Sequence, residues 1–142
     1  MTKNLLSAKA TLEEQNLTCC LTDGVNVIKS CERGVKPLLQ LLDSGTDVSG
    51  FSAADKVVGK AAAFLYVLLG VSEVYAFVIS QKAADVFEKH GITVYFESCV
   101  PAIINRAGDG LCPMETAVGE ISDAHIALCA IKEKLAQLSA SK

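Results

Sequence analysis

SAADKVVGKAAAFLYVLL, residues 52–69, is the longest apolar segment of the chain and predicts its central helix. Ser52 and Asp55 have the spacing of a capping box, and the Ala- and Leu-rich run after them suits a helix buried on most sides. On such a helix Lys56 and Lys60 would share one face in the first turns, where the helix dipole disfavours cations. This conflict favours a role in binding an anion, although solvated or paired lysines would explain it equally well.

Gly59, between these two lysines, is a second unusual choice for a helix. Glycine costs about 1 kcal/mol relative to alanine at an interior helical position. Its presence therefore indicates that backbone or a ligand comes close at this point.

Length and composition predict one compact domain, residues 1–142. Half of the residues are apolar (51%) and 20% are charged, so no segment has the composition of a disordered tail. The net charge of -3 and the lack of a basic stripe argue against binding to long nucleic acid. No apolar run reaches the roughly 20 residues of a membrane helix, and the N-terminus lacks the features of a signal peptide, so we expect a cytoplasmic protein without a membrane segment.

Cysteine spacing argues against disulfides and against a metal site. No Cys-x-x-Cys pair occurs, and His90 and His125 are not at a ligand spacing from one another or from a cysteine. We therefore expect no metal and no cofactor. Most of the six cysteines should be reduced core residues; they are Cys19, Cys20, Cys31, Cys99, Cys112 and Cys129.

The first half of the chain predicts a helix, a hairpin and a second helix. Apolar spacing favours an amphipathic helix over residues 2–15. Residues 17–22 and 25–30 flank Asp-Gly, which suits a two-residue type I′ turn between two strands. Residues 37–43 then predict a short helix with proline in its first turn.

The second half predicts a parallel unit. Residues 73–79 and 92–96 are β-branched and aromatic runs, and residues 81–89 between them predict a helix, so the three form a βαβ unit. Together with the hairpin, this unit predicts an α/β three-layer sandwich: a mixed four-stranded sheet with helices on both faces.

The C-terminal region predicts a loop followed by helices. Residues 99–110 contain proline and a Gly-Asp-Gly run, which favours a short turn of helix and a loop. Apolar residues at near-heptad spacing between Met114 and Leu138 indicate one helix, or two with a break over residues 119–123. This stripe is typical of core packing, and a seam for a homo-oligomer stays open.

Ligands of parallel sheets bind beyond the carboxyl ends of the strands, which directs attention to Ser80 and to the loop that carries Asn105 and Arg106. Strand end and turn former are the structural alternatives for Ser80 and Asn105.

Cys112 stands at the predicted N-cap of a helix, directly before Pro113, with Glu115 at the third helical position. The helix dipole and a neighbouring Arg106 would stabilise a thiolate there, which makes Cys112 a candidate reactive cysteine. Glu115 would oppose this, or act as its acid/base partner. A half-buried thiol that only caps the helix is the alternative.

Several motifs resemble a prokaryotic family of unknown function. They are GVKPLL from Gly34, DKVVGKAAA from Asp55, the strand ending Val78-Ile79-Ser80, Asn105-Arg106, and CPME from Cys112. That family is associated with the cytidine-deaminase-like fold, so the resemblance implies this fold over nearly the whole chain. Deaminases bind zinc through His-x-Glu and Pro-Cys-x-x-Cys motifs, and neither is present here. Zinc-dependent deamination is therefore not expected.

Two functional hypotheses follow. The first is a small-molecule-binding protein or metal-free enzyme in which Lys56, Lys60, Arg106, Cys112 and Glu115 surround one crevice, and its three cations would suit a phosphate-bearing or nucleotide-like ligand. The second is a non-catalytic interaction protein that forms a homo-oligomer through its C-terminal helices.

Overall fold

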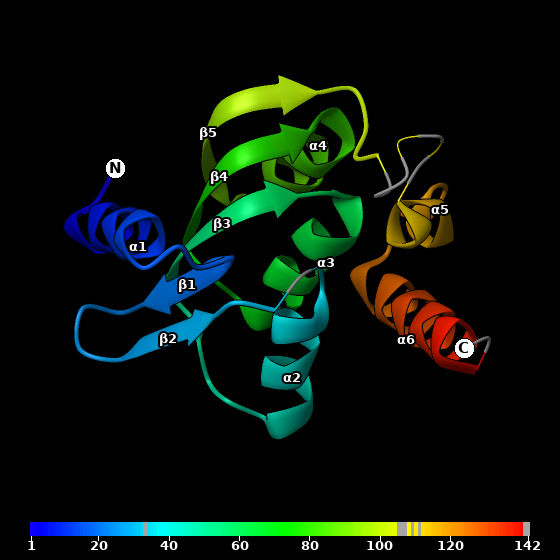
Figure 1. Cartoon of the computed structure of the whole chain (residues 1–142), viewed down its shortest axis with the longest axis horizontal. Coiled ribbons are helices and arrows are strands. Elements are labelled where there is room, and N and C mark those ends of the chain that lie inside the picture. The colour runs from blue at the N-terminus through cyan, green and yellow to red at the C-terminus, as the bar shows by residue number, and fades with distance from the viewer. Residues whose placement is uncertain (33, 105–107, 109, 111, 141–142) are drawn as a thin grey trace.

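The computed structural model describes the chain except for residues 33, 105–107, 109, 111 and 141–142. Within the described residues one mixed sheet has five strands in the order β2-β1-β3-β4-β5 (Figure 1). Strand β1 is antiparallel to both β2 and β3, whereas β3, β4 and β5 are parallel. The strands are β1 Cys19–Thr22, β2 Val27–Ser30, β3 Ser52–Val58, β4 Glu73–Ser80 and β5 Thr93–Val100.

Helices cover both faces of the sheet (Figure 1). Helix α1 lies on one face, α2, α3 and α4 lie on the other, and α5 and α6 pack on the outer side of α3. The predicted arrangement of a mixed sheet between helical layers is thus confirmed. The helices are α1 Lys3–Glu14, α2 Lys36–Ser44, α3 Lys60–Leu69, α4 Gln81–Lys89, α5 Pro113–Val118 and α6 Ala124–Ala140.

The prediction of one helix over residues 52–69 is wrong in its first half. Residues 52–58 form strand β3, and the helix begins at Lys60 after an extended Gly59. Strand β3 pairs with β1 on one side and β4 on the other, so its backbone groups are satisfied by neighbours distant in sequence. This strand is the fifth one, which the predicted four-stranded sheet lacked.

Side chains of β3 alternate between the two faces, as strand periodicity requires. Ala53 belongs to the core on the α3 side and Ala54 to the core beneath α1. Ser52 does not cap a helix, because its hydroxyl donates to the Glu73 carboxylate at 2.8 Å. The predicted capping box is therefore wrong as well.

Most of the other local predictions are confirmed. Helices α1, α2 and α4 and strand β4 match their predicted spans, and a break separates α5 from α6. The hairpin is present, but its loop has four residues, because Thr22 pairs with Val27 and Asp23 accepts the amide N–H groups of Val25 and Asn26. Strand β5 extends to Val100, further than predicted, because it continues to pair with β4.

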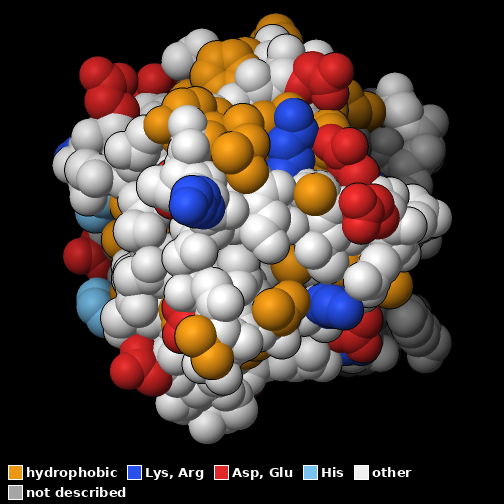
Figure 2. Space-filling view, turned by 90° about the vertical axis from the view of Figure 1, so that its left-hand side faces the viewer, with side chains coloured by type: hydrophobic (Ala, Val, Ile, Leu, Met, Phe, Trp, Pro, Cys, Tyr) orange, Lys and Arg blue, Asp and Glu red, His pale blue; other side chains and the backbone are white. Residues whose placement is uncertain are grey.

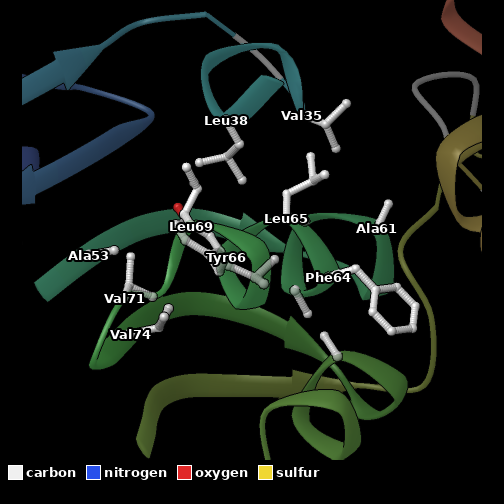
Figure 3. Packing of buried hydrophobic residues seen from close by; sticks show 14 of the residues in the cluster. Val35, Leu38, Ala53, Ala61, Phe64, Leu65, Tyr66, Leu69, Val71 and Val74 are labelled. Carbon is white, nitrogen blue, oxygen red and sulfur yellow. The ribbon is translucent and has the colours of Figure 1, made fainter. Parts of the chain in front are cut away.

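The larger core surrounds α3, whose Phe64, Leu65 and Tyr66 are fully buried. Figure 3 shows Val35 and Leu38 at the start of α2 directed toward Leu65 and Leu69 of this helix. Further apolar contacts come from α6, where Ala127 and Ile131 are completely buried. The C-terminal stripe therefore contributes to the core, as its spacing favours.

The smaller core lies under α1, where Leu5, Ala8 and Leu12 pack on Cys20 and Tyr75. Figure 2 views this side of the molecule and shows apolar side chains gathered at its top, over β4 and β5. The exposed apolar residues of the parallel strands include Val57, Tyr95 and Phe96. Among the described residues, no helix combines the length and apolar character needed to span a membrane.

Two adjacent leucines test the packing of α1. Leu5 is 0% exposed and Leu6 is 49% exposed. Leu5→Ala should lower the free energy of unfolding by about 2–5 kcal/mol, because it opens a cavity between α1 and the sheet. Leu6→Ala, the matched control, should change it by about 0.5 kcal/mol or less. Urea denaturation measures both, and equal losses would contradict the packing of α1 described here.

Candidate functional site

The start of α3 is occupied by a carboxylate from α5. Glu115 accepts the backbone N–H of Lys60 through Oε1 at 2.8 Å and that of Ala61 through Oε2 at 3.1 Å. A Cβ at Gly59 would lie 2.5 Å from the carboxyl carbon of Glu115. The sequence indicated that backbone or a ligand comes close to Gly59; the group that approaches is instead the side chain of Glu115.

Lys60 lies partly buried beside this contact. Its Nζ donates to the carbonyl oxygen of Gly119 at 3.0 Å and stands 5.6 Å from the centroid of the Phe64 ring. Burial lowers the pKa of Lys60, and the nearby charge of Lys82 lowers it further, while Glu120 and Glu115 oppose both effects. The surroundings thus disfavour the charged form of Lys60 relative to a lysine in water.

A hollow of about 200 Å³ lies between α3 and α4, beside the segment that leads into α6. Among the described residues, three lysines and one carboxylate, that of Asp85, line it, and Gln81 donates to that carboxylate at 3.0 Å. Its floor and walls are partly apolar. We call it the α3–α4 hollow; its lining residues are Lys60, Phe64, Lys82, Asp85, Val86, Lys89, His90, Ile121 and Ser122.

A second group of titratable side chains is buried between α3, β3 and β1. Tyr66 donates its hydroxyl to Oδ2 of Asp55 at 2.6 Å, and the Cys19 Sγ lies 3.3 Å from the same hydroxyl oxygen. Burial raises the pKa of Asp55 to about 7 against the stabilising hydrogen bond from Tyr66. Burial and the charge of Asp55 also hold the pKa values of Tyr66 and Cys19 well above their usual range.

A pocket of about 360 Å³ opens onto this group. It lies where β1 and β3 meet the segment before α2, and Asp55, although only 8% exposed, forms part of its wall. We call it the Asp55 pocket; its lining residues are Thr18, Cys19, Glu32, Gly34, Asp55, Lys56 and Val57.

The predicted pair of lysines on one helix face is wrong. Lys56 lies on strand β3 and lines the Asp55 pocket, whereas Lys60 opens α3 and lines the α3–α4 hollow. The Lys56 Nζ donates to Oδ1 of Asn16 at 2.9 Å. The two lysines are separated because the chain changes from strand to helix between them.

Other predicted site residues are placed as follows. Ser80 is buried and caps α4 by accepting the Ala83 N–H at 3.1 Å. Asn105 and Arg106 lie outside the described residues. Cys112 directly precedes α5 and is half-buried, and its side chain makes no capping hydrogen bond. The predicted helix start at Cys112-Pro113 is thus confirmed.

Sequence reasoning missed two features of these sites. Lys82 and Lys89 were not among the predicted site residues, yet they line the same hollow as Lys60. The pairing of Asp55 with Tyr66 was also missed, because both were assigned to one helix and their contact depends on α3 packing against β3. The sequence signal for the α3–α4 hollow was Lys60, a cation at the start of a buried helix, where the helix dipole disfavours positive charge.

The residues present do not fit the zinc ion of a deaminase. The start of α3 carries Lys60 and the start of α4 carries Ser80, Gln81 and Lys82, none of which is a usual zinc ligand. In the part of the chain that the structure describes, no three His, Cys, Asp or Glu side chains gather in a group that could hold a metal ion.

Fold and sites together define an α/β protein built on a five-stranded mixed sheet with three parallel strands. The chain belongs to the family described as a domain of unknown function, DUF1893 (TM1506), whose model matches residues 7–135. The expected membership in a family of unknown function is therefore confirmed.

Among solved structures, the chain is similar to the crystal structure of a DUF1893 family protein (TM1506) from Thermotoga maritima. The two sequences are 28% identical, the TM-score is 0.84, and the match covers 96% of this chain and 92% of that one. A comparison with curated proteins finds no match.

A double-mutant cycle tests the contact between Gly59 and Glu115. Gly59→Ala should destabilise the protein by about 1–3 kcal/mol, because the new methyl group overlaps the carboxylate. In a Glu115→Ala background the same change should cost clearly less, with a coupling of about 1 kcal/mol or more. Gly119→Ala is the control, since a Cβ there meets ordinary contacts at 3.5 Å. Additive losses in urea denaturation would contradict the contact.

Asp55 should make stability depend on pH with a defined sign. Its carboxyl has a pKa of about 7 in the folded state and about 3.9 in the unfolded chain. The folded state therefore holds more protons between these values, and its stability falls as pH rises through this window. Between about pH 4 and pH 7 the free energy of unfolding of the wild-type protein should fall by a few kcal/mol relative to that of Asp55→Asn. Above about pH 7 the difference between the two proteins should stay constant. Urea unfolding across this window measures the difference, and parallel curves would contradict it.

Proposed function

We propose that the protein binds a small anionic ligand in the α3–α4 hollow. The observation that carries this proposal is the convergence of Lys60, Lys82 and Lys89 on one hollow. Among the described residues its lining contains one carboxylate, that of Asp85, and the charges of Glu115 and Glu120 act on Lys60 from nearby. Like charges held together are costly unless an anion offsets them. An anionic group in the hollow would offset them.

The chemistry of the lining suggests the class of ligand. Lysine ammonium groups bind phosphate as point charges, without the planar geometry that arginine imposes. Phe64, Val86 and Ile121 add apolar surface beside them. A phosphate-bearing molecule with an apolar or aromatic portion, such as a nucleotide-like ligand, combines both properties.

Glu115 limits how the anion could bind. Its carboxylate already accepts the N–H groups of Lys60 and Ala61. A ligand would therefore contact the lysine side chains instead of the free N–H groups at the start of α3. A catalytic role for Cys112 and Glu115, and a part for Asn105 and Arg106, stay predictions, as does a ligand role for Lys56 and Ser80.

The proposal also includes a fold family, a cellular location and an excluded reaction. A hairpin beside three parallel strands, with helices on both faces, is compatible with a cytidine-deaminase-like fold. We keep this fold, a cytoplasmic location and the absence of zinc-dependent deamination as parts of the proposal. The alternative, a homo-oligomer through the C-terminal helices, has less apolar surface available, since Ala127 and Ile131 of α6 are buried in the core.

Isothermal titration with pyrophosphate and phenyl phosphate tests the proposal. The double change of Lys82→Ala and Lys89→Ala should weaken binding by about ten-fold or more, which corresponds to about 1.4 kcal/mol, and added salt should weaken wild-type binding. Phenyl phosphate should bind more tightly than inorganic phosphate because of the apolar wall.

Lys3→Ala, an exposed lysine on α1, is the control and should leave the affinity unchanged. If the double variant bound both probes as tightly as wild-type protein, or if wild-type protein bound neither, the proposed function would be wrong.

A further inference from the structure

We propose that the Asp55 pocket is a second binding site, which takes the cationic group of a small molecule, an ammonium or a guanidinium, on the carboxylate of Asp55. This site does not depend on the α3–α4 hollow and has the opposite preference for charge. It rests on the hydrogen bonds, the charges and the size of the pocket.

The hydrogen bonds leave capacity on the Asp55 carboxylate. Oδ2 accepts the Tyr66 hydroxyl at 2.6 Å, and Oδ1 accepts the Val57 N–H at 3.3 Å, which is a long bond. The backbone N–H of Lys56 also favours the ionised carboxylate. An ionised carboxylate offers about four lone-pair positions, so these contacts do not saturate it. Because Asp55 forms part of the pocket wall, a ligand in the pocket could reach the remaining positions.

Asp55 itself has no ion-pair partner among the described residues. Within the described residues the ion pairs are Lys36 with Glu32 and Lys132 with Asp43, so Asp55 is buried there without a paired cation. A buried carboxylate without a cation is costly, and a cationic ligand would relieve that cost.

Among the described residues, the other titratable groups that line this pocket or contact Asp55 come from β1, α3, β3 and the segment before α2. Cys19 from β1 and Tyr66 from α3 are kept neutral, because burial raises the pKa of each. Glu32, before α2, adds a second carboxylate at the rim, where the Lys36 Nζ lies 3.9 Å from its Oε1. Lys56 is the cation of the described lining, and its Nζ is bonded to Asn16; Arg33 lies outside the described residues.

The size of the pocket suits a small ligand. Its volume of about 360 Å³ lies at the lower end of the roughly 300–1,000 Å³ of small-molecule sites. A guanidinium could form two parallel hydrogen bonds to the carboxylate, and an ammonium could form one.

Ionisation of Asp55 gives the site a pH dependence. Burial raises the pKa of Asp55 to about 7, so the carboxyl is largely neutral at pH 6 and largely ionised at pH 8. A cation binds the ionised form, so the affinity should rise by about ten-fold over this interval.

The experiment is a titration of isotope-labelled protein, residues 1–142, with methylguanidinium chloride, followed by amide chemical shifts at pH 6 and pH 8. Sodium chloride at equal concentration serves as the reference. The expected result is saturable shifts of the Cys19, Gly34 and Val57 amides, about ten-fold weaker in affinity at pH 6. This comparison uses wild-type protein alone, so it does not depend on whether a variant folds.

Two variants then separate the floor of the pocket from its rim. Asp55→Asn should abolish the shifts, whereas Glu32→Gln should weaken the affinity only a few-fold, because Glu32 is an exposed carboxylate at the rim that already pairs with Lys36. Three results would overturn the proposal: no saturable amide shifts at pH 8, equal affinity at pH 6 and pH 8, or shifts only of amides near other surface carboxylates. So would inorganic phosphate shifting the same amides in place of methylguanidinium, because the pocket would then be a site for anions.

Discussion

The buried hydrogen bond from Tyr66 to Asp55 is the constraint on which the rest of the structure depends. Helix α3 is apolar on nearly every side, and Tyr66 brings a hydroxyl into that interior. Without a hydrogen-bond partner, a buried hydroxyl typically destabilises the folded state by about 1–3 kcal/mol, and by several kcal/mol at most. Asp55 supplies the partner, and this sets the position of α3 against β3, while Cys19 extends the contact to β1.

The second constraint is the carboxylate of Glu115 at the start of α3. It satisfies two N–H groups that would otherwise lack partners, and it connects α5 to the central helix. Gly59 is the residue that makes room for it. Lys60 reaches across to the carbonyl oxygen of Gly119, which places its Nζ 5.6 Å from the centroid of the Phe64 ring.

These two constraints place charge of opposite sign in two different pockets. The α3–α4 hollow gathers three lysines on the outer side of α3, and the Asp55 pocket places a carboxylate in the middle of β3, where Asp55 pairs with Cys19 of β1. Membership of the DUF1893 family does not assign a reaction, because the family is itself described as of unknown function. Function must therefore be sought in these pockets, since a fold by itself does not determine chemistry.

The sequence by itself determined the elements that carry a strong local signal. Amphipathic spacing predicted α1, proline and flanking residues predicted α2 and the start of α5, and β-branched runs on either side of α4 predicted a parallel unit. In each case the pattern spans one element, and local preference agrees with the final structure.

Only the tertiary structure decided the state of residues 52–58 and the composition of both pockets. A short apolar run fits a buried strand as well as a buried helix, and here pairing with β1 and β4 selects the strand. That choice moves Lys56 away from Lys60 and turns Asp55 toward Tyr66. Lys60, Lys82 and Lys89 come together only because α3 packs against α4. Contacts between distant segments have no periodic signal in sequence, so packing alone determined them.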